Sequence, residues 1–162
     1  TGRNGSGKTT LIMCISNNFI GNTFNSNIYR KDTSIMEIGS SPSLMPELSL
    51  LENIKYFLFN ENINETTISN VLDKYELDSF KSDLIGDFSS GMVKRSEIAI
   101  ADLKNPKVLC IDEPKVYLDE NGVDLLLNLI TKREKEGNAS ILSSQESIGA
   151  FTSIERSINL ND

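Results

Sequence analysis

The sequence contains no histidine and only two cysteines among its 162 residues. Without histidine, the usual general base near neutral pH and the commonest metal ligand are excluded from any site. Two cysteines are too few for a disulfide framework, and Cys14 and Cys110 both fall in apolar segments. We therefore expect two buried thiols in a reducing compartment, and we assign them no chemistry.

Long apolar runs and an excess of positive charge are also lacking. The most apolar stretches, Tyr56–Phe59 and Leu125–Ile130, fall short of the roughly 20 residues that cross a bilayer. Acidic residues outnumber basic ones by 23 to 16, and the formal net charge is −7. Because nucleic-acid backbones are bound by clustered Lys and Arg, this charge disfavours nucleic acid as a partner. We expect a cytoplasmic protein that attaches to a membrane only through a partner.

The first motif lies at the start of the chain, where residues 2–9 read Gly-Arg-Asn-Gly-Ser-Gly-Lys-Thr and match the phosphate-loop pattern GxxxxGK[ST] in full. The glycines of this pattern let backbone N–H groups curl around phosphates, Lys8 reaches the β- and γ-phosphates, and Thr9 ligates Mg²⁺. The residues expected to bind ATP are Gly2, Asn4, Gly5, Ser6, Gly7, Lys8, Thr9 and Thr10. The alternative, a glycine-rich turn without a ligand, is disfavoured because a helix pattern begins directly after it.

A second motif is a pair of carboxylates, Asp112 and Glu113, at the end of the apolar run Val108–Ile111. In this position Asp112 would hold the Mg²⁺ shell, and Glu113 would polarise a water for in-line attack on the γ-phosphate. Taken alone, such a pair is usually a solvated turn or a helix cap. The long separation from Lys8 leaves room for a helical region inserted between two halves of one site.

A third motif, Phe88–Met92, opens a predicted helix. A serine with small neighbours at a helix N-terminus offers backbone N–H groups and a hydroxyl to an anion. By itself, such a serine is more often simply an N-cap.

Apolar patterning predicts strands alternating with helices. Helices are expected at Leu11–Ile15, Ser49–Phe59, Ile68–Tyr75, Ser89–Leu103 and Asn121–Lys135, and strands at Ser26–Arg30, Ser34–Gly39, Val108–Ile111, Ala139–Leu142 and Ile154–Leu160. This alternation favours an α/β fold of the P-loop NTPase type with a mainly parallel sheet. We expect one domain over residues 1–162. Because a phosphate loop normally follows a buried strand, we also expect that the first strand is missing ahead of Thr1.

With the three motifs in this order, the chain resembles the ATP-binding cassette family over almost its whole length. Residues 2–9 resemble its Walker A loop, residues 88–92 a variant of its LSGGQ signature, and residues 108–113 its Walker B strand. The resemblance implies a helical subdomain at about 49–103 inserted in a RecA-like core. It further implies that Ser89 and Gly91 contact ATP bound to a second ABC ATPase subunit in a head-to-tail dimer, and that Asp119, the D-loop aspartate, belongs to the nucleotide site.

Two switch positions depart from the family pattern. Ile38–Pro42 resembles the Q-loop, with Ser41 where glutamine is expected beside the metal held by Thr9 and Asp112. A serine is too short to reach the metal as glutamine does. Ile141–Gln145 resembles the H-loop, with Gln145 in place of histidine. An amide hydrogen-bonds a phosphate oxygen but exchanges no proton near neutral pH. With Lys8, Glu113 and Gln145 as the implied catalytic residues, we expect slow hydrolysis that depends on Glu113.

Three further segments, Pro46–Asn53, Phe88–Met92 and Leu118–Val123, most resemble the haem exporter ATPases of cytochrome c biogenesis of the alphaproteobacterial type. This resemblance implies attachment to integral-membrane transporter subunits at the cytoplasmic face of the inner membrane. Two alternatives stay open: the ATPase subunit of another small ABC exporter, and an ATP-dependent dimerising clamp with little hydrolysis, which Ser41 and Gln145 would suit. A small-molecule kinase is disfavoured, since such enzymes lack the third motif in this order.

Overall fold

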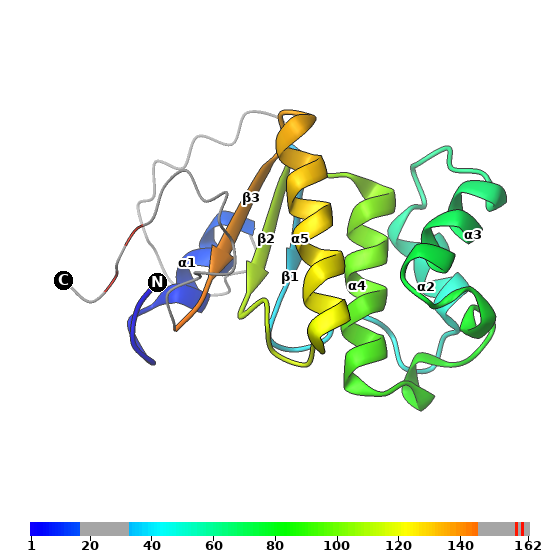
Figure 1. Ribbon diagram of the computed structural model, residues 1–162, viewed down its shortest axis with the longest axis horizontal. Helices are drawn as coiled ribbons and strands as arrows, with labels where there is room; N and C mark the ends of the chain where they lie inside the picture. Colours follow the sequence, from blue (N-terminus) through cyan, green and yellow to red (C-terminus); the bar gives the residue numbers. More distant parts are fainter. Residues whose placement is uncertain (17–32, 146–157, 159, 161–162) are drawn as a thin grey trace. The chain divides into compact units, whose positions relative to one another are not determined.

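The computed structural model describes residues 1–16, 33–145, 158 and 160 (Figure 1). These residues form two compact units. The first comprises the described residues of Thr1–Ser40, Pro106–Pro114 and Ile130–Asp162, and the second comprises Ser41–Asn105 and Lys115–Leu129. A subdomain at about 49–103 stays a prediction.

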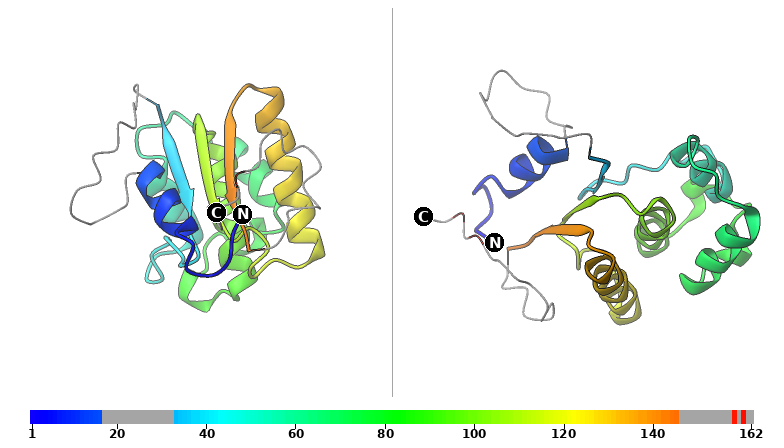
Figure 2. Two further views of the ribbon diagram at one scale, coloured as in Figure 1. Left: turned by 90° about the vertical axis from the view of Figure 1, so that its left-hand side faces the viewer. Right: turned by 90° about the horizontal axis from the view of Figure 1, so that it is seen from above.

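The first unit contains a sheet of three parallel strands, β1 (Ile35–Ile38), β2 (Val108–Asp112) and β3 (Ala139–Ser143), in the order β1-β2-β3. Figure 2 shows the three strands side by side. The central strand β2 is an almost continuous apolar run, as expected for a parallel strand covered on both faces, and its Leu109 and Cys110 are fully buried. Because the strands are parallel, all three end at the same edge of the sheet.

Helix α1 (Lys8–Ser16) follows the phosphate loop and packs on this sheet, where it contacts all three strands. Its Ile12 is 2% exposed and supplies the apolar contact. The helix therefore holds the phosphate loop against the sheet. At the far end of the chain, the Leu160 N–H donates to the Thr1 carbonyl at 2.9 Å.

The second unit is helical. It contains α2 (Leu50–Phe57), α3 (Glu65–Lys74), α4 (Ser90–Lys104), the greater part of α5 (Glu120–Lys135), and short 3-10 turns at Asp78–Phe80 and Ile85–Asp87. Each of the first three helices begins at a residue whose side chain caps it: Ser49, Asn64 and Ser89 accept hydrogen bonds from backbone N–H groups of the first turn. Helix α4 ends at Asn105, whose φ of 41° is left-handed, directly before Pro106.

Two buried polar residues organise this unit from within. The fully buried side chain of Asn53 on α2 accepts from the Met45 N–H at 2.8 Å and donates to the Met45 carbonyl at 3.0 Å. Glu97 on α4, 1% exposed, accepts from both the backbone N–H and the hydroxyl of Ser43 at 2.8 and 3.0 Å. These bonds attach the segment that precedes α2 to two helices.

Most predicted elements that fall in the described residues are confirmed, within three residues at their ends. The predicted strands Ser26–Arg30 and Ile154–Leu160 lie outside the described residues, apart from Ile158 and Leu160. The prediction of which α5 residues face inward is wrong in part. The predicted residues were Val123, Leu126, Leu127 and Ile130. Leu126 and Leu129 are each 1% exposed, while the other three predicted residues are only half-buried. The buried stripe runs through Gly122, Leu126, Leu129 and Arg133, at helical spacings of three and four.

The structure bears on two expectations from composition, which concern membrane-spanning helices and the burial of the two cysteines. Among the helices that the structure describes, none has the length and apolarity needed to cross a bilayer. Cys110 is buried as predicted, whereas Cys14 on α1 is only half-buried. Burial raises the pKa of the Cys110 thiol to about 11, with a further contribution from the negative charge of Glu37.

Candidate functional site

The loop at residues 2–7 curls because two of its glycines adopt backbone conformations that side chains disfavour. Gly5 has a φ of 82° and Gly7 a φ of 90°, both in the left-handed region. A Cβ atom at either position would meet nothing within 4 Å. The glycines are therefore needed for the path of the backbone rather than for space, as expected of a loop that turns its N–H groups inward.

The Lys8 side chain lies along this loop and is almost completely buried, at 8% exposed. Its Nζ donates to the Gly2 carbonyl at 2.7 Å and to the Arg3 carbonyl at 2.9 Å. Both acceptors are neutral oxygens, so these bonds leave the positive charge of Lys8 to attract an anion at the loop. In the same loop, the buried hydroxyl oxygen of Ser6 has no hydrogen-bond partner among the described residues.

Asp112 lies at the carboxyl end of β2 and is 1% exposed. Thr9 Oγ1, on the first turn of α1, donates to its Oδ2 at 2.7 Å. The Ser143 hydroxyl, at the end of β3, donates to its Oδ1. Both carboxylate oxygens are thus bonded to hydroxyl groups, and the three residues come from three different elements.

Glu113 follows directly and has a left-handed φ of 50°. Its N–H donates to the Ser143 carbonyl at 3.0 Å. Such a conformation costs a non-glycine residue about 1–3 kcal/mol and is concentrated at functional sites. Both acidic residues therefore lie at the carboxyl end of β2.

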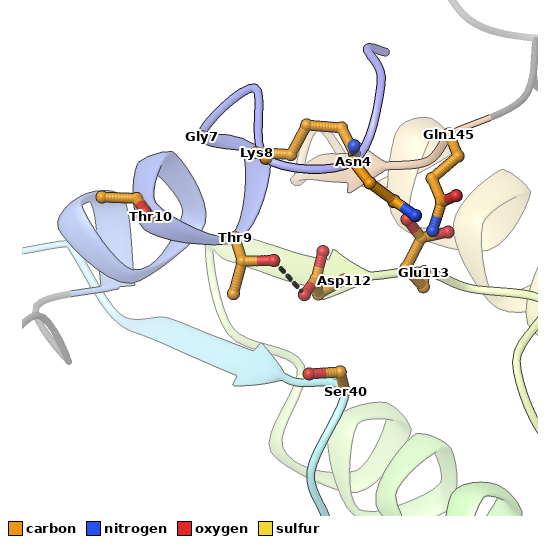
Figure 3. A pocket seen from close by; sticks show the side chains of 10 residues that line it. Asn4, Gly7, Lys8, Thr9, Thr10, Ser40, Asp112, Glu113 and Gln145 are labelled. Carbon is orange, nitrogen blue, oxygen red and sulfur yellow. Dashed lines mark hydrogen bonds between the residues drawn. The ribbon is translucent and has the colours of Figure 1, made fainter.

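A cavity of about 290 Å³ lies at this edge of the sheet (Figure 3). All the residues that line it belong to the first unit. The lining residues are Asn4, Gly5, Gly7, Lys8, Thr9, Thr10, Ser40, Asp112, Glu113 and Gln145. They come from the phosphate loop, the start of α1 and the residues that end or follow the three strands. Open α/β sheets bind their ligands at this edge, outside the carboxyl ends of the strands.

Nine residues predicted for the site line the cavity, and other predicted residues lie elsewhere. Gly2 and Ser6 belong to the phosphate loop but are not lining residues. Ser41, predicted beside the metal, does not line the cavity and belongs to the second unit, whereas Ser40 does line it. A role of Ser41 beside the metal stays a prediction. Ser40 is the second residue after β1, as Gln145 is the second after β3, and this shared spacing was the signal that could have identified it.

Three further predicted nucleotide-binding residues lie in the second unit, where each has a local structural role. Ser89 caps α4 by accepting from the Met92 N–H at 3.2 Å. The Asp119 carboxylate accepts from the Gly122 N–H at 2.8 Å, at the start of α5. A Cβ atom on Gly91 would lie 3.2 Å from the Tyr117 carbonyl oxygen, so Gly91 permits a close backbone approach. Contact of these residues with a nucleotide stays a prediction.

The residues present fit a triphosphate with Mg²⁺. The phosphate loop supplies backbone N–H groups and the charge of Lys8, and it contains the buried Ser6 hydroxyl, which has no hydrogen-bond partner among the described residues. Thr9 and Asp112 supply the oxygen atoms that Mg²⁺ prefers. No group of three or more His, Cys, Asp or Glu side chains that could enclose a metal occurs among the described residues. Mg²⁺ at nucleotide sites takes one or two carboxylates and completes its shell with substrate phosphates and water.

Comparison with known proteins agrees with this geometry. Residues 1–116 match the family model described as ABC transporter, and this range includes both the phosphate loop and the Asp112–Glu113 pair. The match therefore covers the greater part of the chain.

Similar curated proteins include the lantibiotic transport ATP-binding protein SrtF of Streptococcus pyogenes, 34% identical over 152 residues. The alignment covers 88% of this chain and 65% of SrtF. The cytochrome c biogenesis ATP-binding export protein CcmA of Reclinomonas americana is 32% identical over 155 residues, with 88% of this chain and 69% of CcmA covered. The chain thus spans only part of the length of these relatives.

Among solved structures, one described as the ATP binding subunit of an ABC transporter superposes with a TM-score of 0.79 at 26% identity, covering 93% of this chain and 68% of its own. This likeness confirms the predicted α/β P-loop NTPase fold. The family model matches residues 1–116, and the phosphate loop and the acidic pair line one cavity. The chain therefore belongs to the ABC transporter family and represents its ATPase domain.

Proposed function

We propose that this chain binds ATP with Mg²⁺ in the cavity above the phosphate loop and hydrolyses the ATP to drive a membrane transporter. The observation that supports this most directly is the hydrogen bond of 2.7 Å from Thr9 to Asp112, which joins the phosphate loop to the acidic pair. Lys8, Glu113 and Gln145 line the same cavity. A cationic loop and a proton acceptor at one polar cavity are what phosphoryl transfer requires.

Phosphate binding falls to the loop and Lys8. Backbone N–H groups of the loop would bind the β- and γ-phosphate oxygens, and Lys8 would exchange its bonds to the Gly2 and Arg3 carbonyls for bonds to phosphate. Thr9 and Asp112 would hold Mg²⁺, which would neutralise the negative charge that develops on the phosphate during transfer. Their hydroxyl and carboxylate already lie in contact with one another.

Glu113 is the residue proposed to accept the proton. The attacking water forms a bond to the γ-phosphorus while the bond from that phosphorus to the oxygen of ADP breaks, and the water's proton passes to the Glu113 carboxylate. Gln145 has an amide that donates to a γ-phosphate oxygen but takes up no proton. The chain contains no histidine to share this task. Hydrolysis is therefore expected to be slow and to depend on Glu113.

A second copy of the ATPase subunit would complete each nucleotide site in a head-to-tail dimer. Ser89 and Gly91 lie at the start of α4, where the positive end of a 15-residue helix favours an anion. Asp119 would lie near the same interface of the proposed dimer. Integral-membrane subunits are the proposed second partner, since no described helix spans a bilayer. The chain would then attach at the cytoplasmic face of the inner membrane.

Two transported cargoes are proposed, because relatives with different cargoes match this chain about equally well. Likeness to CcmA supports haem export for cytochrome c biogenesis, and likeness to SrtF at a similar identity supports lantibiotic transport. The membrane subunits would select the cargo, so the two proposals are distinguished by identifying the membrane proteins that copurify with this chain. Haem bound to those proteins would support the first proposal.

A dimerising clamp with little hydrolysis is the second candidate, and Gln145 at the cavity favours it. The two functions are separated by measuring phosphate release and ATP affinity on the full-length protein and on Glu113→Gln. The variant is expected to bind ATP with unchanged affinity and to release phosphate about 10²- to 10⁴-fold more slowly. Glu134→Gln, an exposed glutamate on α5, serves as the control. Equal rates for the wild type and Glu113→Gln would remove Glu113 from its role. Tight ATP binding with dimerisation but no phosphate release would favour the clamp.

A further inference from the structure

Ser143 and Asp112 end neighbouring strands at the same level of the sheet. They are direct partners in the register of β2 and β3, so their side chains project from the same face. Each is a polar residue at the end of a largely apolar strand, and each is buried, with Asp112 1% and Ser143 6% exposed. A buried carboxylate next to a buried hydroxyl needs that hydroxyl as a partner.

The two oxygens of Asp112 are bonded to different hydroxyl groups. Ser143 Oγ donates to Oδ1, and Thr9 Oγ1 donates to Oδ2 at 2.7 Å. Each carboxylate oxygen accepts more than one bond. Ser143 thus holds one oxygen in place, while the other is turned toward Thr9, the second residue with an oxygen suited to Mg²⁺.

Ser143 also contacts the neighbouring acidic residue through its main chain. Its carbonyl accepts from the Glu113 N–H at 3.0 Å. This bond does not involve the Ser143 side chain. The contribution of the hydroxyl can therefore be tested without removing the support of Glu113.

We propose that Ser143 is a positioning residue that orients the Asp112 carboxylate for Mg²⁺. This inference rests on the proposed function. Partners that orient a metal-ligating carboxylate typically change metal affinity by about 10- to 100-fold when they are removed. The effect of Ser143 should therefore appear in the Mg²⁺-dependent part of ATP binding and leave metal-free ATP binding unchanged.

The test compares Ser143→Thr with Ser143→Val, two side chains of nearly equal shape that differ in one hydroxyl. Calorimetry on the full-length protein gives the ATP affinity with Mg²⁺ and with EDTA. Ser143→Thr is expected to keep the wild-type ratio of the two affinities, and Ser143→Val to lower it about tenfold. Ser143→Ala, measured in parallel, keeps the test intact if the valine variant does not fold. Ser144→Ala, at the half-buried neighbour, is the control.

Two results would overturn the role of Ser143. Equal ratios for the threonine and valine variants would show that the hydroxyl has no part in metal binding. A valine variant that loses affinity equally with Mg²⁺ and with EDTA would show a general structural loss. A wild-type protein that binds ATP in neither condition would instead refute the proposed function, and is recognised without any variant.

Discussion

Thr9 Oγ1 and Asp112 Oδ2 lie 2.7 Å apart in a hydrogen bond, although 103 residues separate them along the chain. Thr9 lies in the first turn of the helix that follows the phosphate loop, and Asp112 ends the central strand. The bond joins the phosphate loop to the Asp112–Glu113 pair, and both motifs line one cavity. It also gives the mutations below a common expectation: changes at the phosphate loop and at the acidic pair should alter the same reaction.

Lys8→Ala is expected to weaken ATP binding by about 10- to 100-fold, because a hydrogen bond from a charged donor to phosphate is lost. Filter binding with radiolabelled ATP measures the change. Lys135→Ala, an exposed lysine at the end of α5, is the control. Unchanged binding in Lys8→Ala would mean that the phosphates do not lie in the loop.

Gln145→His should accelerate phosphate release, by about tenfold, since an imidazole takes part in proton transfer at neutral pH. The wild-type chain contains no histidine, so the new side chain adds the only imidazole. Its reference pKa of about 6.5 predicts a rate that rises with pH from 6 to 8, as the imidazole becomes neutral. A pH–rate profile identical to that of the wild type would contradict a position near the γ-phosphate.

Cys14 and Cys110 should differ in their reaction with thiol reagents. Because burial raises the pKa of Cys110 to about 11, only about a thousandth of this thiol is ionised at pH 8. Cys14 is half-buried. One labelled cysteine per native chain is expected at pH 8 and two after denaturation, measured by mass spectrometry. Prompt labelling of Cys110 in the native protein would contradict the buried central strand.

Glu97→Ala should destabilise the helical unit by about 3 kcal/mol. The variant removes the acceptor for the Ser43 N–H and hydroxyl, and it removes a carboxylate 3.5 Å from the buried Lys94 ammonium. Urea unfolding followed by circular dichroism measures the loss. Glu61→Ala, at an exposed position, should change stability by less than about 0.5 kcal/mol. Equal stabilities of the two variants would contradict the buried cluster.

Features encoded within a few residues could be predicted from the sequence. The glycines of the phosphate loop specify its left-handed turns, and the serine caps of α2 and α4 bond N–H groups three residues ahead. The apolar run of β2 identifies a covered parallel strand. Each of these depends on local backbone preference or on burial of one segment.

Other features were decided by pairing between distant segments. The register of β2 against β3 places Ser143 beside Asp112, and no pattern within either strand specifies that partner. The end of β1 decides that Ser40 rather than Ser41 lines the cavity, and packing selects Leu129 for the buried face of α5. A sequence determines which segments form strands and helices through local geometry and apolar period. The residues that meet at a site depend on long-range hydrogen-bond register and core packing, which arise only when the segments assemble.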